Sequence, residues 1–576
     1  PPTSSSVDLP MAGFQDAPPP PAEAIVLNGV PAPYGDDAEV EGIDPLDRAD
    51  LPAPIPVDDS GVASVAPVPV STATVVAVGE PLPPEKPTDV PAFAVESVAV
   101  EPTPVERRAG HAARLFWLWF AANSSIVTIA VGAALFASGM SLRQALVAVV
   151  AGVALSALPL GLGSLAGKWS GQPTMVVSRA TFGLVGNILP ALIAIVGRVL
   201  WAGVLLWLLA ATAGAVFAPG EGAGATAFVA LAAGVVLAGI VAVLGYGLLH
   251  RVQRVLGILS TVLLLVVIGF TASHVDIEVA LRTDDGSWWL ALGGIVTVFS
   301  VIGLAWAQSS SDLARYQNPE GSGAANMLWS SFGTIVPTLA ILSWGAVLAA
   351  SDPDLSGDLA AAPLATLLDL VPAVLVIPMF ASAAFGLVAG AIVAIYSGGL
   401  AINAAGLSAP RPVSALIAAV LAAAVAAGVL LIGADTRDIV TDIATTVAVP
   451  VAAWTGIFGA EMMIRLRRFH APSLLARGGV YPAVRWVNLI GLLVITAVGW
   501  GFTSAELTGF TWQGYLFTAL GVADPIASTD AGVLVALGLG LLLPLVAGIP
   551  AIRRQERDRE LPDAAPTGGV AAPLVD

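Results

Sequence analysis

From position 114 onward, long apolar segments alternate with short polar ones along the chain. Twelve of the apolar segments are about as long as the roughly 20 residues that an α-helix needs to cross the hydrocarbon core of a bilayer. The pattern therefore predicts an all-α integral membrane protein with about twelve transmembrane helices. These helices are expected at residues 115–139, 142–166, 187–217, 225–248, 252–272, 288–309, 327–350, 371–397, 413–432, 443–464, 484–502 and 531–552.

The composition agrees with this pattern. Of 576 residues, 56% are hydrophobic and 11% are charged, which is typical of a protein with many membrane spans. The chain contains no cysteine, which excludes disulfides, thiolate catalysis and cysteine metal sites. The four histidines show no metal-ligand spacing. We therefore expect neither a metal site nor a cofactor, and no nucleic-acid partner.

Residues 1–105 differ from the rest of the chain. They are rich in Pro, Ala and Val and hold 17 acidic but only two basic side chains, so most of the net charge of −17 lies here. Frequent proline breaks helices and central strands, which predicts a disordered acidic tail. Such a tail is either a solvated extension or a docking arm. No basic region precedes a short apolar core, so we do not expect a signal peptide.

The basic residues between the predicted spans give the orientation, because cytoplasmic loops carry the excess of Lys and Arg. Eighteen basic residues flank one side of the predicted spans, and only Arg143, Arg282 and Arg437 flank the other. Both termini are therefore expected in the cytoplasm, with the chain crossing a bacterial-type cell membrane.

Two predicted spans contain polar interruptions at corresponding positions. Asn123, Ser124 and Ser125 lie in the middle of the first span, and Gln308 begins a polar run directly after Trp306 in the sixth. Irregular backbone at membrane depth occurs where it is buried in protein or lines a wet cavity. Paired interruptions in two halves of a chain indicate an inverted-repeat transporter with its site at the repeat interface. The alternative is that these polar residues only form interhelical hydrogen bonds.

The third predicted span contains Arg198 and, three residues later, Trp201. A charge at this depth is costly unless it is paired or solvated, so Arg198 is expected to face the bundle interior or a cavity. It either acts in gating or forms a structural pair with a carbonyl or carboxylate. Trp201 and Trp306 could stack on the two faces of a flat ring. The alternative for both tryptophans is ordinary packing or anchoring at the membrane interface.

Five stretches together resemble the nucleobase:cation symporter family, the cytosine, purine, allantoin and hydantoin permeases. They are WFAANSSIVTIAVGA (119–133), GQPTMVVSRATFGLVGNILPAL (171–192), SSSDLARY (309–316), AIYSGGLAINAAGL (394–407) and WTGIFGAEMMIRLRR (454–468). The resemblance implies a five-plus-five inverted repeat (LeuT-like) with two extra C-terminal helices. The expected divisions are a transporter core at 106–466, two further spans at 467–552 and a cytoplasmic tail at 553–576.

The resemblance also implies roles for individual residues. Trp201 and Trp306 match the family tryptophans that stack on the substrate ring, and Asn123, Gln308 and Ser309 are candidates for hydrogen bonds to it. Candidate cation-binding or gate residues are Ala122, Ser124, Arg198, Asp312 and Arg315.

The sequence departs from the family at four functional positions. Leu205 stands where many members carry Gln or Asn to read ring amides, and Ala394 stands near the position of a substrate-binding asparagine. The family's sodium-binding hydroxyls would fall near Val388 and Ala389, which supply no oxygen ligand for a hard cation. The exact substrate and the coupling ion, H⁺ or Na⁺, therefore stay open. Asp312 and Glu461 are candidate proton carriers; alternatively, Asp312 and Arg315 form an intracellular gate.

We therefore expect a secondary transporter that imports a small planar nitrogen heterocycle by alternating access. The alternatives are an inverted-repeat carrier of another small solute, such as an amino acid, osmolyte or vitamin, and a transporter-derived membrane sensor. An enzyme is not expected, because the spans show no carboxylate pair, Ser–His constellation or ligand cluster. The lipid bilayer and the small solute are the expected partners, and the oligomeric state is left open.

Overall fold

The computed structural model describes residues 86–558, apart from 221–223, 434–435, 467 and 525. In this part of the chain, helices are joined by turns and loops. These residues belong to one compact unit, residues 83–576. Within the described ranges the only β-type pairing is a single bridge between Gly110 and Gln317. The tail residues 1–85 and 559–576 lie outside the described residues.

Ten helices in this part of the chain are long and apolar enough to cross a membrane. Two further spans are a bent pair of helices, at Ala113–Ala122 and Ile126–Ala137, and the short apolar helix α19 (Trp486–Gly501). Together with the ten long helices they match the twelve predicted spans. The protein is therefore a multi-pass membrane protein. The ten helices are α3 (Leu142–Ser170), α6 (Ile188–Phe217), α7 (Ala225–Leu244), α8 (Tyr246–Thr271), α10 (Trp288–Val298) with its continuation, α13 (Gly323–Ser351), α16 (Val376–Ala404), α17 (Arg411–Ile432), α18 (Thr436–Ile464) and α21 (Gly532–Leu543) with α22 (Ile549–Asp558).

The first span is broken. Helix α1 (Ala113–Ala122) ends before Asn123, and after a short 3₁₀ turn α2 (Ile129–Ala137) continues at an angle of 68°. The sixth span is interrupted differently. Helix α10 runs into a π-helical segment (Phe299–Leu304) and α11 (Ala305–Ala307), and the helix is lost only at Gln308 and Ser309, before α12 (Ser310–Ala314). π-Helical turns inside α-helices occur frequently at functional sites.

Local sequence explains where the long helices begin and end. The Ser141 hydroxyl accepts a hydrogen bond from the backbone N–H of Gln144, and the Gln144 side chain accepts one from the backbone N–H of Ser141. This capping box starts α3. Gly171, with φ +71°, ends it in a left-handed conformation that suits glycine.

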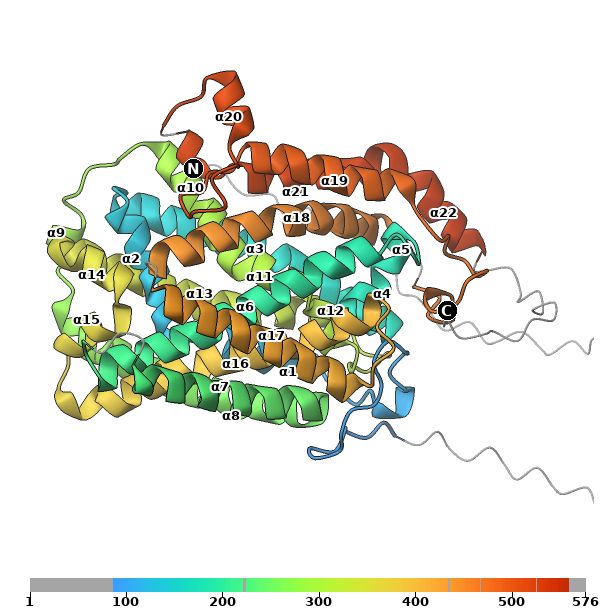
Figure 1. Cartoon of the computed structure of the whole chain (residues 1–576), viewed down its shortest axis with the longest axis horizontal. Coiled ribbons are helices and arrows are strands. Elements are labelled where there is room, and N and C mark those ends of the chain that lie inside the picture. Colours follow the sequence, from blue (N-terminus) through green and yellow to red (C-terminus); the bar gives the residue numbers. More distant parts are fainter. Residues whose placement is uncertain (1–85, 221–223, 434–435, 467, 525, 559–576) are drawn as a thin grey trace, which may run out of the picture. The chain divides into compact units, whose positions relative to one another are not determined.

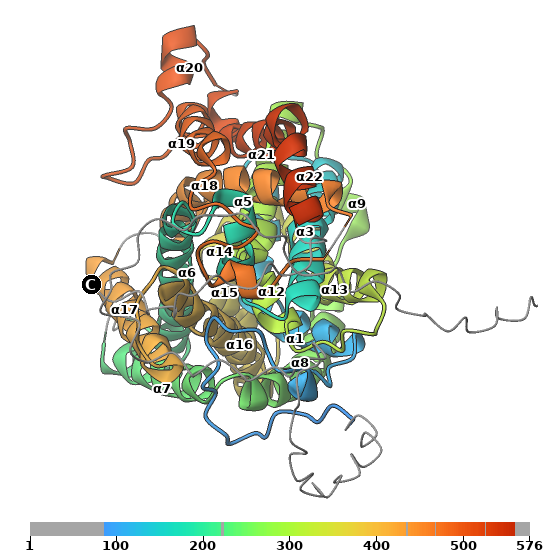
Figure 2. The same ribbon diagram turned by 90° about the vertical axis from the view of Figure 1, so that its right-hand side faces the viewer.

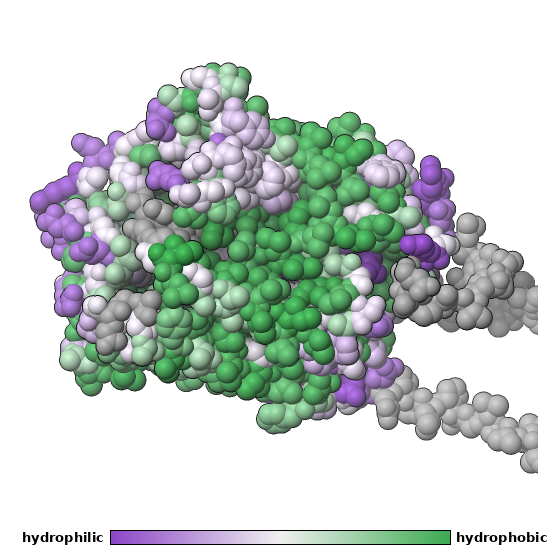
Figure 3. All heavy atoms as spheres, viewed as in Figure 1, coloured by the Kyte–Doolittle hydropathy of each residue, from purple (hydrophilic) through white to green (hydrophobic). Residues whose placement is uncertain are grey.

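Short helices gather at the two ends of the long ones (Figure 1). One end, at the right in Figure 1, carries residues 86–110, α4 (Thr174–Val177), α5 (Arg179–Phe182) and α12. We call it the N-terminal face, after the first residues that the structure describes. The other end, the opposite face, carries α9 (Ile277–Ala280), α14 (Ser356–Ala361), α15 (Pro363–Asp369) and α20 (Tyr515–Leu520). A broad apolar surface lies between the two polar ends, as expected for a bilayer-spanning protein (Figure 3).

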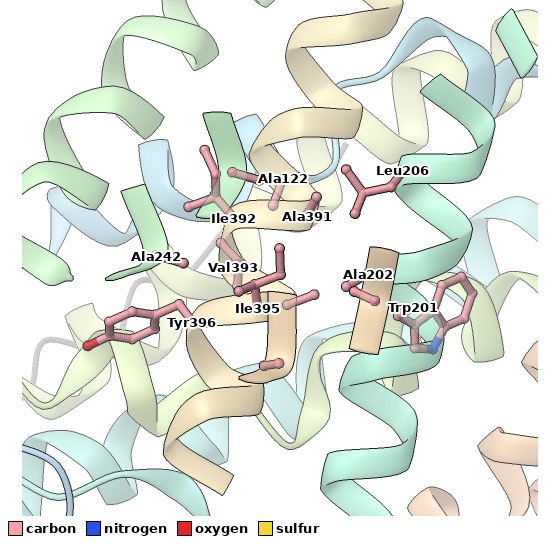
Figure 4. Packing of buried hydrophobic residues seen from close by; sticks show 14 of the residues in the cluster. Ala122, Trp201, Ala202, Leu206, Ala242, Ala391, Ile392, Val393, Ile395 and Tyr396 are labelled. Atoms are coloured by element: carbon pink, nitrogen blue, oxygen red, sulfur yellow. The ribbon is translucent and has the colours of Figure 1, made fainter. Parts of the chain in front are cut away.

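Helices α6 and α16 lie side by side in the interior and position the site. Small residues allow the close approach, because a Cβ on Gly398 would already lie 3.3 Å from the Arg198 side chain. Figure 4 shows Ala202 and Leu206 of α6 on the side toward Ala391 and Ile395 of α16, within one cluster of buried apolar side chains that also includes Trp201. The two helices therefore form a rigid wall next to the broken first span.

Residues 86–105 differ from the expected disordered tail. This segment is mostly non-helical, but it is held against the N-terminal face by hydrogen bonds such as Thr103 N–H to Gly171 O (2.8 Å) and Glu96 N–H to Leu244 O (3.1 Å). The physical reason is that the buried carboxylate of Glu96 meets a cationic partner there, Arg315. One buried ion pair of this kind cannot be recognised from the composition of the segment.

Candidate functional site

A cavity of about 550 Å³ lies beside the break in the first span and extends toward the opposite face. Its inner part is bounded by that break, by α6, and by the π-helical segment with α11. Toward the opposite face it is lined by Ala360, Pro363 and Asp530 among others. The inner lining includes Asn123, Trp201, Leu205, Val301, Ala305 and Trp306.

Trp306 is fixed by the broken first span. Its indole Nε1–H donates a 3.0 Å hydrogen bond to Asn123 Oδ1, and the Asn123 amide N–H donates a 2.8 Å hydrogen bond to the carbonyl of Trp119. The two tryptophan rings, 119 and 306, are 5.9 Å apart and tilted by 58°. Asn123 therefore holds the edge of the Trp306 indole, while Trp306 itself lines the cavity.

Trp201 and Leu205 line the same cavity from α6. Residues four apart on a helix share a face, so the two side chains lie one above the other. A Cβ on Gly390 of α16 would lie 2.9 Å from the Leu205 side chain, which shows how closely α16 backs this wall. The structure thus brings both predicted stacking tryptophans and Leu205 to one cavity, and the wall beside Trp201 offers apolar contact rather than hydrogen bonds.

Arg198, Gln308 and Ser309 do not line the cavity; they lie in the buried layer around Trp306. Arg198 donates a 3.1 Å hydrogen bond to the Ser309 hydroxyl, and its guanidinium carbon is 5.6 Å from the centre of the Trp306 ring. This distance permits a cation–π interaction. Both side-chain amide atoms of Gln308 are buried, with no hydrogen-bond partner among the described residues.

Asp312 and Arg315 lie closer to the N-terminal face and have different partners. Asp312 Oδ1 accepts hydrogen bonds from the backbone N–H (2.8 Å) and the hydroxyl (3.0 Å) of Thr174. Arg315 forms its ion pair with Glu96. Burial raises the pKa of Asp312 to about 6, despite the hydrogen bonds from Thr174 that favour its ionised form.

Glu461, the other candidate proton carrier, is held in an ion-pair network. It pairs with Arg485 and, at 3.7 Å, with Arg465, and it accepts a 2.9 Å hydrogen bond from the amide of Asn488. Removing the charge of a carboxylate that is buried between two arginines would leave those cations without a counter-charge. The structure therefore favours a structural role for Glu461.

Several carbonyls at the first break already accept hydrogen bonds, which leaves few free ligands there for a sodium ion. The carbonyls of Trp119 and Ala121 accept hydrogen bonds from the Asn123 amide (2.8 Å) and the Ser124 hydroxyl (3.1 Å). On α16, the carbonyl of Ala389 accepts a 2.8 Å hydrogen bond from the side-chain amide of Gln253 on α8. Val388 and Ala389 add no side-chain oxygen. Protein donors thus point at carbonyl oxygens that a hard cation would need as ligands.

Sequence reasoning does not single out three polar residues that prove to be central. Gln253 lies between Arg251 and Arg254, so its surroundings are those of a basic helix end. Thr174 is the partner of Asp312, and Glu96 is the partner of Arg315. Thr174 lies inside the stretch 171–192, which resembles the permease family, and this resemblance is the one sequence feature that could have pointed to it. Nothing in the sequence near Glu96 distinguishes it from the other acidic residues of the tail.

Comparison with known proteins agrees with this geometry. The family model described as "Permease for cytosine/purines, uracil, thiamine, allantoin" matches residues 102–527. A putative purine-cytosine permease of Bacillus subtilis is 29% identical over 273 residues, 46% of this chain and 56% of that protein. An uncharacterized permease of Schizosaccharomyces pombe is 32% identical over 108 residues, 19% of each chain. The chain thus spans less than two thirds of the length of either relative.

Solved structures of similar fold are transporters. Mhp1, a nucleobase-cation-symport-1 family transporter in a closed conformation with bromovinylhydantoin bound, superimposes with a TM-score of 0.60 at 15% identity, covering 80% of this chain and 95% of that one. A Na⁺-coupled sialic acid symporter gives a TM-score of 0.50 at 13% identity, covering 76% and 91%. These likenesses confirm the expected inverted-repeat transporter fold. Because the family model matches most of its length, the chain belongs to the family of permeases for cytosine and purines, uracil, thiamine and allantoin.

Proposed function

We propose that the protein is a secondary transporter that carries a planar nitrogen heterocycle across the membrane by alternating access. The observation that carries this proposal is that Trp201 and Trp306 line one cavity at the break of the first span. Membership of the permease family supports it. So does the hydantoin ring that is bound in Mhp1, a protein of similar fold.

The two tryptophans supply the stacking surface in this proposal, because aromatic faces favour offset planar partners. Asn123 acts through Trp306, since its amide oxygen is already engaged by the indole N–H. Leu205, Val301 and Ala305 offer only apolar contact. The ring is therefore selected more by shape and stacking than by hydrogen bonds to its edge, unlike the pattern expected where Gln or Asn stands at position 205.

The access route follows from the position of the cavity. It reaches toward the opposite face, whereas the residues between Trp306 and the N-terminal face are closely packed. Most basic loop residues lie at the N-terminal face, so we propose that this face is cytoplasmic and that the structure is open toward the outside. Rocking of one helix bundle against the other would then expose the site to the cytoplasm.

We propose that transport does not use sodium at the first break. The support is the set of hydrogen bonds from Asn123, Ser124 and Gln253 to the carbonyls there.

Asp312 is the proton carrier in this proposal, because it is buried, has no ion-pair partner within 4 Å among the described residues, and its pKa is raised by burial to about 6. The result is a proton-coupled carrier.

The test is counterflow in proteoliposomes preloaded with candidate solutes: cytosine, uracil, a hydantoin, allantoin and thiamine. We expect one of these to drive accumulation of its labelled form, and Trp306→Ala to reduce the rate at least about tenfold. Trp289→Ala is the matched control, because Trp289 is 46% exposed at the start of α10. Binding without exchange would point to a sensor, and unchanged exchange by Trp306→Ala would contradict the proposed site.

A further inference from the structure

Residues 86–108, which we call the strap, cross the N-terminal face and are bound to several helices there. Figure 2, which looks onto this face, shows the strap in blue passing close to the ends of α8 and α16. The match to the permease family begins at residue 102, so most of the strap lies outside it.

Glu96 is the centre of the strap. Its side chain is 4% exposed. One carboxylate oxygen, Oε1, meets three groups: the Arg315 guanidinium, the Tyr316 hydroxyl and, at 3.1 Å, the Tyr396 hydroxyl. The other oxygen, Oε2, accepts a 2.8 Å hydrogen bond from the backbone N–H of Tyr246. One carboxylate thus joins the end of α12, the C-terminal third of α16 and the start of α8.

The fold leaves room for this carboxylate. A Cβ on Gly245, which has φ +92°, would lie 2.2 Å from Glu96 Oε2. A Cβ on Gly247 would lie 2.1 Å from the carbonyl oxygen of Pro91. Real Cβ atoms do not come this close, so these two glycines permit the strap to seat.

Several further contacts hold the strap on either side of Glu96. Arg315 Nη1 donates a 3.0 Å hydrogen bond to the carbonyl of Ala99, and Arg251 donates one of 3.0 Å to the carbonyl of Val90. Asp89 pairs with Arg114 at 2.7 Å. Burial opposes ionisation of Glu96, but the nearby charges of Arg315 and Arg411 outweigh it, so the pKa of Glu96 lies below its ordinary value.

In the alternating access proposed above, opening of this face would separate α12 from α16 and α8. We infer that Glu96 is the gate residue of the N-terminal face: its contacts with Arg315, Tyr396 and Tyr246 hold these three helices together and must break each time the face opens. This inference assumes the alternating access proposed above. Removing one partner of a buried ion pair leaves the other charge unpaired. Loss of the Glu96 charge would therefore favour the state in which Arg315 reaches water.

A thiol reporter can measure this opening, because the chain contains no cysteine. Ser397→Cys places one on α16 at a site that is 1% exposed and beside Asp312. The measurement is the rate of maleimide labelling of the purified full-length protein. It needs no substrate, so it is independent of whether the transported solute has been identified.

We expect Glu96→Gln, introduced into the Ser397→Cys reporter protein, to speed maleimide labelling about tenfold. A tenfold change corresponds to about 1.4 kcal/mol, which is near the lower end of what one hydrogen bond to a charged group contributes. Glu106→Gln, which alters an exposed carboxylate of the same strap, is the matched control and should label like the unaltered reporter. A Glu96→Gln reporter protein that melts like the unaltered one and labels no faster would overturn the inference.

Tyr396→Phe provides a second test that does not unpair a charge. It removes one hydrogen bond to Glu96 and keeps the ring, so we expect a smaller increase in labelling rate, about threefold. If Glu96→Gln does not fold, this variant decides: faster labelling supports the gate, and labelling at the rate of the unaltered reporter overturns it.

Discussion

The indole N–H of Trp306 donates a 3.0 Å hydrogen bond to the side-chain oxygen of Asn123, so the sixth span is tied to the break in the first span. The same asparagine donates through its amide nitrogen to the carbonyl of Trp119. One side chain thus caps a broken helix and orients a wall of the cavity. This arrangement makes the position of the Trp306 ring depend on the shape of the break.

Asn123→Ala should weaken transport through this link. It removes the acceptor of the Trp306 indole and one donor at the end of α1, and each hydrogen bond contributes roughly 1 kcal/mol. We expect the apparent affinity for the transported solute to fall about tenfold while the protein still reaches the membrane. The measurement is concentration-dependent uptake in proteoliposomes with matched protein content. An affinity equal to that of the parent would show that the link has no role in the site.

Leu205→Gln should change selectivity rather than abolish transport. The new amide would enter the cavity one helical turn from Trp201 and could bind the edge of a ring. We expect rings with exposed amide groups to gain about tenfold over apolar analogues in competition uptake assays. Leu205→Met, which keeps the volume and the apolar character, is the control and should preserve the parent ranking. An identical ranking for both variants would place Leu205 away from the bound ring.

Replacing sodium with choline at constant pH should change the uptake rate by less than about twofold. The reason is that protein donors already occupy the carbonyls of Trp119, Ala121 and Ala389, which a hard cation would need as ligands. The measurement is initial uptake in proteoliposomes with defined internal and external salt. Loss of most of the uptake in choline would show that a sodium site exists despite these hydrogen bonds.

Asp312 should make stability depend on pH. Burial raises its pKa in the folded protein from 3.8 to about 6. The neutral carboxyl therefore favours the folded state, fully below about pH 3.8, and this contribution is lost as the pH rises through about 6. We expect the melting temperature of the parent to fall between about pH 4 and pH 6 relative to that of Asp312→Asn, and to level off at higher pH. Parallel melting curves over this range would indicate that Asp312 ionises as readily as an exposed carboxyl.

The sequence predicts the membrane frame well because length and apolarity are local properties. The polar run at Asn123 indicates the first break, and the structure bends the chain there by 68°. The resemblance to the family directs attention to Trp201 and Trp306, and both line the cavity. These features depend on short stretches of chain whose meaning does not require knowledge of distant partners.

Other features depend on contacts between distant residues. Glu96 pairs with Arg315 across 219 positions, and Gln253 donates to Ala389 across 136. The sequence suggests that Asp312 and Arg315, three residues apart, act together, but they take Thr174 and Glu96 as partners. Side-chain pairing of this kind is set by the packing of helices, which periodicity and composition do not specify.

The most direct measurement of the central claim is an experimental structure with a transported heterocycle bound, determined by cryo-electron microscopy in a lipid environment. We expect density for a flat ring between the indoles of Trp201 and Trp306, beside Leu205, with the Trp306–Asn123 hydrogen bond intact. Density for the ring at any other place, with the two indoles in direct contact or turned toward lipid, would contradict it.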